Sequence, residues 1–306
     1  MILIGENIHV ISKKIRESLL SRDESFFVNL VNLQKDMDCI DLNVGPAKGA
    51  MEGVLPWLAE LVQCNSNLGI SFDTTNYQEM EKGFAVCQNK ESAFLNSVSL
   101  DEERFSKMAD IALNNNCNLI GLTLSKDIGI PKTSDGRLEI AFELYEKCLE
   151  LGIDSEKLYF DPLILPIGVE QGQALEALNT IKMIKESFDP PVKTIVGLSN
   201  ISNGCPKELR PLINRVYAVM AYGAGLDAAI VDACDLELIR VLRMLDNGKP
   251  KSDVDRLYFR LADMVRDFSD IDDVEFNSES FQEQEIIKCA EVLLNRKIYS
   301  NSFTQV

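Results

Sequence analysis

Short apolar segments recur along the chain, and each begins about 23–40 residues after the previous one, the spacing typical of βα units. They are residues 2–8, 39–44, 69–74, 93–98, 118–124, 158–165, 194–199 and 227–233. Their apolar positions are continuous rather than alternating, which is typical of parallel strands buried on both faces. Parallel strands require crossover connections, which the segments between them are long enough to supply.

The segments between the apolar runs show the 3.6-residue periodicity of helices that pack on one face. Examples are Phe27, Leu30 and Val31, then Phe105, Met108 and Ala112, then Leu175, Leu178, Ile181 and Ile184. Strand and helix in eightfold alternation predict a (β/α)8 TIM barrel. The alternative is a doubly wound open sheet, which normally has a glycine-rich turn after its first strand. Here the first strand leads into Glu6-Asn7-Ile8-His9, so the pattern favours the barrel.

Carboxylates and amides, together with two hydroxyls, recur where the predicted strands end. They are Glu6, Asn7, Asp41, Asn43, Asp73, Asn76, Asn96, Thr123, Asp161, Ser199, Asn200 and Asp232. In a (β/α)8 barrel the carboxyl ends of the strands meet at one face, where catalytic groups lie. We therefore expect an active site rich in side-chain oxygens and amides at that face, and nearly empty of histidine and cations.

Three of these side chains suit a flat heterocycle. Asp73 can accept two donors from a ring that bears an amide N–H beside an amino group, which is the donor pattern of a pterin. Asp161 precedes Pro162, which fixes the direction of the chain after the strand. Asn96 offers an acceptor and two donors for the remaining ring edge. Each residue alone is also a common turn or helix-cap residue, so their convergence carries the prediction.

Asn200 and His9 differ in what they can do. Asn200 is neutral at every working pH, so it can hydrogen-bond a ring nitrogen before and after that nitrogen gains a proton. Gly197 allows a ligand to approach the backbone. His9 is the only histidine, and a lone histidine is more often a polar surface residue than a catalyst. No Ser-His-Asp triad or histidine-based zinc site can be assembled from it.

The pattern changes after the eighth predicted strand. Residues 236–245 predict the closing helix, residues 254–268 an added helix, and residues 285–295 a further helical segment. Between them, residues 270–285 carry seven acids and no Lys or Arg. This acidic, helical C-terminal insertion, at about residues 246–285, is either a solvated surface or a docking element for a protein partner. We expect residues 1–306 to form a single domain that includes it.

Composition narrows the class of protein. A net charge of −17 and a pI near 4.6 disfavour a nucleic-acid partner and an anionic membrane surface. The eight cysteines are spread singly without a CxxC pair, which disfavours a structural metal site and fits a reduced compartment. No signal peptide and no apolar run of membrane-spanning length is visible. We therefore expect a soluble, cytoplasmic enzyme that binds no metal itself.

Several segments together resemble a known family. They are ENIHV, DLNVGPA, SFDTTN, NSVS, LIGLTLSK, YFDPLILP, GLSNIS, RPLINR and LDAAIVDACD. They are similar to the methyltetrahydrofolate:corrinoid protein methyltransferases and to the folate domain of cobalamin-dependent methionine synthase. The resemblance runs from about residue 1 to 244 and resumes near residues 290–303. GLSNIS together with RPLINR is its most specific part.

The resemblance implies a pterin-binding barrel that forms a homodimer. It moves a methyl group between N5 of tetrahydrofolate and the cobalt of a corrinoid, the cobalamin-type cofactor, on a partner protein. The corrinoid must come from another protein, because the chain lacks the D-x-H-x-x-G pattern of a corrinoid-binding module. The resemblance implies that this partner is either an iron–sulfur protein or a small cobalamin shuttle. The implied roles are pterin binding by Asp73, Asn96 and Asp161, and hydrogen bonding to N5 by Asn200. The implied neighbours are Asp41, Asn43, Gly197, Ser199, Arg210 and Asn203, the last in place of a family glutamine.

Two alternatives remain at this point. Dihydropteroate synthase is a related barrel with a similar FDP segment, but its seventh strand ends near a lysine, where this chain has Gly-Leu-Ser-Asn. A folate-binding subunit without catalysis is the other alternative, against which the retained Asp, Asn and Asn set argues. The direction of methyl transfer and the pathway are not determined by these residues.

Overall fold

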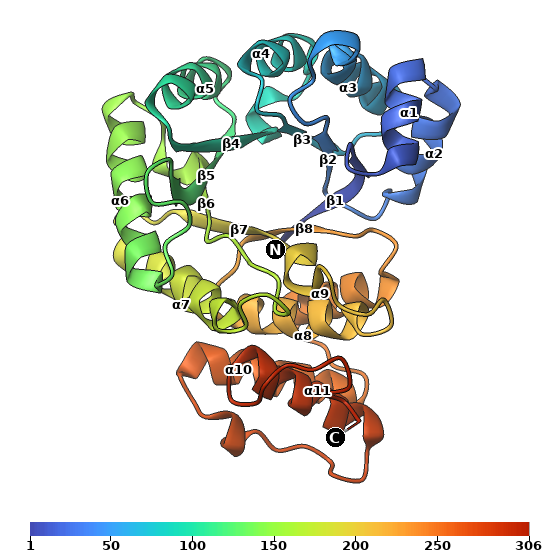
Figure 1. The fold of residues 1–306 in the computed structure, drawn as a ribbon, viewed down its shortest axis with the longest axis vertical. Helices are drawn as coiled ribbons and strands as arrows, with labels where there is room; N and C mark the ends of the chain where they lie inside the picture. Colours follow the sequence, from blue (N-terminus) through green and yellow to red (C-terminus); the bar gives the residue numbers. More distant parts are fainter. Residues whose placement is uncertain (306) are drawn as a thin grey trace.

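The computed structural model describes residues 1–305, without the side chain of Glu103. Parallel strands close into a barrel in which β1 pairs with β8 (Figure 1). The strands are β1 (Ile2–His9), β2 (Cys39–Asn43), β3 (Gly69–Asp73), β4 (Phe94–Leu100), β5 (Asn118–Ser125), β6 (Leu158–Asp161), β7 (Lys193–Gly197) and β8 (Ala228–Val231). The predicted (β/α)8 barrel is confirmed.

Helices follow the strands and surround the barrel (Figure 1). The α-helices are α1 (Lys13–Ser21), α2 (Glu24–Leu33), α3 (Val54–Asn65), α4 (Tyr77–Val86), α5 (Glu102–Asn115), α6 (Ser134–Glu150), α7 (Gly172–Ser187), α8 (Arg210–Gly223), α9 (Leu236–Asn247), α10 (Asp253–Asp267) and α11 (Phe281–Leu293). The short 3-10 helices are η1 (Gly49–Met51), η2 (Lys90–Ser92), η3 (Ser155–Lys157), η4 (Leu198–Ser202) and η5 (Ile271–Asp273). Asp23, Asn76 and Asp101 accept backbone N–H groups at the starts of α2, α4 and α5, which explains where these helices begin.

The sixth strand is shorter than the pattern predicts. We expected residues 158–165, but β6 ends at Asp161, whereas each other strand boundary lies within two residues of its predicted position. Pro162 has no N–H to donate to a neighbouring strand. Leu163 then takes a φ of 63°, outside the range of a strand, and its N–H bonds to the Asp161 carboxylate at 2.7 Å. The apolar residues after Asp161 therefore belong to a loop over the end of the barrel.

An apolar layer closes the inside of the barrel below its carboxyl end. This buried cluster consists of Ile4, Cys39, Phe94, Ile120, Tyr159, Ile195 and Ala228, which come from seven different strands. Phe94 and Tyr159 meet edge to face at 5.0 Å between ring centroids. The layer makes the barrel a packed core rather than a pore. It forms the floor beneath the carboxyl ends of the strands.

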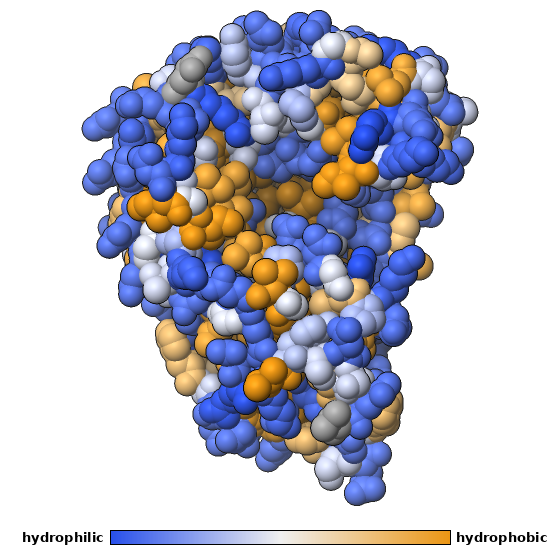
Figure 2. All heavy atoms as spheres, viewed as in Figure 1, coloured by the Kyte–Doolittle hydropathy of each residue, from blue (hydrophilic) through white to orange (hydrophobic). Residues whose placement is uncertain are grey.

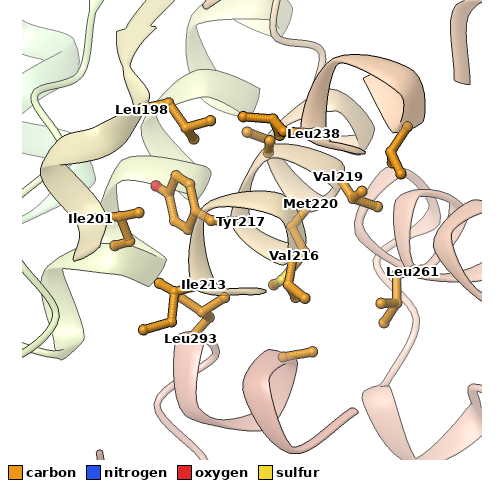
Figure 3. Packing of buried hydrophobic residues seen from close by; sticks show 14 of the residues in the cluster. Leu198, Ile201, Ile213, Val216, Tyr217, Val219, Met220, Leu238, Leu261 and Leu293 are labelled. Carbon is orange, nitrogen blue, oxygen red and sulfur yellow. The ribbon is translucent and has the colours of Figure 1, made fainter. Parts of the chain in front are cut away.

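The C-terminal helices extend the molecule on the α8 side of the barrel (Figure 1). The predicted added helix is present as α10, and α10 and α8 share a buried cluster that includes Val216, Met220 and Leu261 (Figure 3). The helices approach so closely at Gly223 that a Cβ there would lie 2.2 Å from the Ala262 carbonyl oxygen.

The last helix begins earlier than the sequence indicates. α11 starts at Phe281 rather than at residue 285, because the Ser280 hydroxyl accepts the N–H of Glu283 and caps the helix there. Within residues 1–305, no helix has the length and apolar character needed to cross a membrane.

Candidate active site

A cavity of about 870 Å³ opens at the carboxyl ends of the strands. Figure 2, viewed as in Figure 1, shows the molecule hollowed at the centre of the barrel. Every predicted site residue lines this cavity: Asp41, Asn43, Asp73, Asn96, Asp161, Gly197, Ser199, Asn200, Asn203 and Arg210. The fold thus brings together side chains from distant parts of the chain, while their roles remain predictions.

The two-residue repeat of a strand explains how these side chains come to face the cavity. Residues two apart lie on the same face of a strand. Glu6 therefore follows Ile4 into the barrel interior, and Asp161 follows Tyr159 in the same way. The same step places a polar layer directly above the apolar floor.

Strand register fixes the neighbours within this layer. Asn43 lies opposite Asp73 in the pairing of β2 with β3, and Asp73 lies opposite Asn96 in the pairing of β3 with β4. Parallel neighbours are about 4.8 Å apart, so side chains at one level can contact each other directly. The three residues form a continuous polar arc along one side of the cavity.

Asp73 and Asp41 form a tightly coupled pair at the base of this arc. The Asn43 amide donates to Asp73 Oδ2 at 2.5 Å, and the Ser71 hydroxyl donates to Asp41 Oδ1 at 2.6 Å. Burial raises the pKa of Asp73 to about 6, although the bond from Asn43 opposes the rise. Burial and the nearby charge of Asp73 raise the pKa of Asp41 well above its usual value. The pair therefore holds a proton more readily than two surface carboxyls would.

Asp161 lies at the end of β6 and faces the same space. Its Oδ1 accepts the Leu163 N–H, and among the described residues Oδ2 has no hydrogen-bond partner. Burial raises the pKa of Asp161 to about 7, while that bond and the charge of Arg137 oppose the rise. One carboxylate oxygen is thus anchored and the other is available to a ligand.

Glu6 belongs to the site as well, although the sequence indicated it only as a polar residue near a strand end. Its Oε1 accepts the Ser199 hydroxyl at 2.6 Å. Burial raises the pKa of Glu6 to about 7, and the charge of Asp232 adds to the rise. The signal that would have identified it is its position two residues after Ile4, the same step that links Tyr159 to Asp161.

Asn200 has a different environment from the carboxyls. It lies on η4, directly after β7, and its side chain is exposed to the cavity. Its amide makes no side-chain hydrogen bond within the described part of the chain. A Cβ at Gly197 would lie 3.0 Å from Asn200 Nδ2, so glycine leaves this amide its space. The amide is therefore free to bond with a ligand.

The cavity holds more cationic side chains than the strand ends alone indicated. Lys207 and Arg210 both line the cavity, and so does His9. Arg210 is held by a 2.9 Å bond from its Nε to the Cys205 carbonyl oxygen. The sequence missed Lys207 because it lies in the loop after η4 rather than at the end of a strand.

Three of the polar residues near strand ends lie outside the cavity lining. The Asn7 amide donates to Asp232 Oδ1 at 2.6 Å and accepts the Ala233 N–H at 2.9 Å. Asn76 caps α4 by accepting the N–H groups of Gln78 and Glu79. Thr123 is fully buried, and its hydroxyl donates to the Asp161 carbonyl oxygen at 3.0 Å. All three residues therefore serve the structure around the site.

The donor set suits a planar, nitrogen-rich ring. Carboxylates and amides form its polar arc, and the apolar Ile230, which packs against the apolar floor, also lines the cavity. In residues 1–305, no group of three or more His, Cys, Asp and Glu side chains is arranged to hold a metal ion.

Comparison with known proteins agrees with this chemistry. Residues 41–232 match the family described as pterin binding enzymes, which is more than half of the chain. The chain belongs to the pterin-binding enzyme family. The matched residues include the ends of β2 to β8, and so the whole polar arc.

Two curated proteins with sequences similar to this chain are methionine synthases. That of Mycobacterium tuberculosis (strain ATCC 25618 / H37Rv) is 27% identical over 248 residues, which cover 76% of this chain and 20% of the relative. That of Mycobacterium leprae (strain TN) is 25% identical over 253 residues, with the same coverage. This chain therefore spans about a fifth of the length of the curated relatives that it matches.

Solved structures support the fold. A Yersinia pestis dihydropteroate synthase superposes with a TM-score of 0.58 at 14% identity, covering 81% of this chain and 94% of the other. A Xanthomonas albilineans dihydropteroate synthase gives 0.60 at 15%, covering 80% and 91%. At such low identity these likenesses show the barrel alone.

Proposed function

We propose that this chain transfers a methyl group between N5 of tetrahydrofolate and the cobalt of a corrinoid carried by a partner protein. The observation that carries the proposal is the similarity to methionine synthases over 248 residues, which cover 76% of this chain. The free amide of Asn200, placed among carboxyls that bind the ring, supports it. The structural likeness to dihydropteroate synthases supports only the barrel.

The pterin ring fits the polar arc in this proposal. Asp161 Oδ2 accepts from the ring amide N–H or amino group, because its other oxygen is already engaged. Asp73 and Asn96 take the adjoining donors and acceptors of the ring. Asp41 and Asn43 hold Asp73, while Gly197 and Ser199 let the ring approach the end of β7.

Asn200 acts at N5 in this proposal. When the methyl carbon leaves N5, the electron pair of the broken bond stays on that nitrogen. An amine anion is a very poor leaving group, so N5 must carry a proton at that stage. The amide of Asn200 can accept from the N5–H or donate to the N5 lone pair, and so stabilises both states. The corrinoid supplies a cobalt atom that takes or gives the methyl group, and the open end of the cavity leaves it access.

One experiment tests the proposal directly. The chain is mixed with 5-methyltetrahydrofolate and reduced cobalamin, and loss of the reduced cobalamin absorbance is followed. We expect enzyme-dependent transfer, with tetrahydrofolate formed in equal amount. Binding of the folate without transfer would leave the chain a non-catalytic folate-binding subunit.

The control assay addresses the rival activity. Lys207 and Arg210 bring cations to the cavity, a feature that an enzyme of pterin pyrophosphate would share. The chain is therefore incubated with p-aminobenzoate and pterin pyrophosphate. We expect no dihydropteroate, and its accumulation would replace our proposal with dihydropteroate synthase activity. The homodimer and the identity of the corrinoid protein stay predictions, which light scattering and pull-down can address.

A further inference from the structure

The chain after α11 returns to the barrel and lies against the loop that follows β6. We call residues 292–299 the C-terminal clasp and residues 162–171 the β6 loop. A Cβ at Gly168 would lie 3.6 Å from Cε1 of Tyr299, so the tyrosine ring packs directly on this loop. The clasp lies beyond residues 41–232, the part that matches the family.

Gln171 joins the clasp to the β6 loop through three hydrogen bonds. Its Nε2 donates to the carbonyl oxygens of Val292 at 2.9 Å and Lys297 at 2.6 Å. Its Oε1 accepts the N–H of Tyr299 at 2.7 Å. The bond to Val292 adds a side-chain donor to a carbonyl at the end of α11 that also accepts the Asn295 N–H at 3.0 Å.

The position of Gln171 shows that this connection is specific. It is the N-cap residue of α7, where Ser, Thr, Asp or Asn would normally bond to the helix. The Gln171 side chain makes no such capping bond. Its amide is used for the clasp instead, and the β6 loop is tied to a segment more than a hundred residues later in the chain.

The β6 loop passes this connection on to the cavity. It starts directly after Asp161, whose carboxylate accepts the Leu163 N–H. Further along, the Ile167 N–H bonds to the Ile201 carbonyl oxygen at 2.9 Å, next to Asn200. Ile167 and Ile201 are buried in the same cluster as Leu293 of α11 (Figure 3 labels the last two).

A second contact runs from the clasp to the loop after η4. The Tyr299 hydroxyl donates to Asn301 Oδ1 at 3.0 Å and lies near enough to the Cys205 thiol for the two groups to interact electrostatically. The Cys205 carbonyl oxygen in turn accepts Nε of Arg210, which lines the cavity. The clasp therefore lies against the β6 loop, which follows Asp161, and near the segment between Asn200 and Arg210.

We propose that the C-terminal clasp positions the loops after β6 and β7 for folate binding, with Gln171 as the positioning residue that closes it. A loop that is already ordered loses less conformational entropy when a ligand binds, so its affinity is higher. The inference rests on the proposed function for the identity of the ligand, but the ordering of the loops does not depend on it.

The test compares Gln171→Ala with a matched control, Gln63→Ala. Gln63 on α3 also bridges two segments, because its Nε2 donates to the Val86 carbonyl oxygen and its Oε1 accepts the Gln88 N–H. α3 lies on the opposite side of the barrel from α11 (Figure 1). Hydrogen–deuterium exchange of residues 162–171 and 198–205 is measured, together with the dissociation constant for tetrahydrofolate.

We expect both loops to exchange faster in Gln171→Ala and tetrahydrofolate to bind about tenfold more weakly, in line with the loss of several hydrogen bonds. Gln63→Ala should speed exchange only near residues 86–88 and leave the dissociation constant unchanged. If Gln171→Ala fails to fold, Gln171→Met keeps the length of the side chain and loses the same bonds.

Wild-type exchange in both loops of the Gln171 variant would overturn the clasp, as would equal weakening in the Gln63 control. Failure of the proposed function has a different signature. In that case the wild-type chain does not bind tetrahydrofolate, while the exchange of the two loops still reports on Gln171.

Discussion

The cavity has two parts whose side chains differ in their hydrogen bonding. The carboxyl layer consists of Glu6, Asp41, Asp73 and Asp161, while η4 carries Asn200. Each carboxyl accepts at least one hydrogen bond from a protein donor. Within the described residues, the Asn200 side chain accepts none and donates none.

This difference suits each part of the cavity to a different role. The carboxyl layer is held in place and has raised pKa values, so it is prepared before a ligand arrives. The ionised carboxylates can then bind the ring, and the fraction that is ionised depends on pH. Asn200 is left unengaged and neutral, which suits a group that must follow a changing protonation state at one ring nitrogen.

The largest expected effect comes from removing that free amide. In Asn200→Ala we expect methyl transfer to slow by about 100- to 1000-fold, the usual loss for one donor that stabilises a charge change. Folate affinity should be nearly unchanged, because the carboxyl layer is intact. Single-turnover transfer to reduced cobalamin measures the rate, and calorimetry measures the affinity.

Asn203→Ala is the matched control, since Asn203 is another exposed amide of the same cavity. It should retain most of the wild-type rate. An Asn200→Ala protein that reacts as fast as the wild type would erase the distinction between the two parts of the cavity.

A smaller effect, on binding, is expected from the carboxyl layer. In Asp161→Asn we expect affinity for tetrahydrofolate to fall by about 10- to 100-fold, because a charge-assisted hydrogen bond to the ring becomes a neutral one. Equilibrium titration by intrinsic fluorescence measures it. Asp235→Asn is the control, because Asp235 also lines the cavity but caps α9, a task that asparagine performs equally well. Equal losses in the two variants would remove the specific role of Asp161.

The pH dependence of binding sharpens the same point. The ionised form of Asp161 is the one that accepts from the ring, and its pKa is raised to about 7 by burial. Affinity should therefore rise between about pH 5.5 and 7.5, by up to about tenfold per pH unit, and then level off. The Asp161→Asn protein should show a flatter profile. A wild-type affinity that is constant over this range would contradict the assignment.

The sequence predicted the site better than it predicted what supports the site. Apolar runs located the strands because a buried parallel strand leaves little choice of residue, and polar residues at their ends followed. Pro162 alone does not show where β6 ends, because the end of the strand depends on the loop conformation at Leu163. The position of Lys207 in the cavity and the contact between Gln171 and the clasp could not be predicted for a similar reason. Their positions depend on how loops and helices pack, and no periodicity records such packing.

The smallest expected effect is on stability, and its sign follows from the raised pKa of Glu6. A carboxyl with a folded-state pKa of about 7 keeps its proton in the folded chain, while the unfolded chain loses it near pH 4.5. Stability is therefore lost as pH rises from about 4.5 to 7, since the folded state binds more protons in that window. Glu6→Gln keeps the oxygen that accepts from Ser199 and removes the buried charge. We expect it to raise the free energy of unfolding at pH 8 by on the order of 1–2 kcal/mol, with no gain at pH 4. Denaturant unfolding at pH 4 and pH 8 measures the difference in the free energy of unfolding. In these experiments we propose that residues 1–306 unfold in a single transition, as one domain. A gain of equal size at both pH values would show that packing, rather than the charge of Glu6, sets the stability of the carboxyl layer.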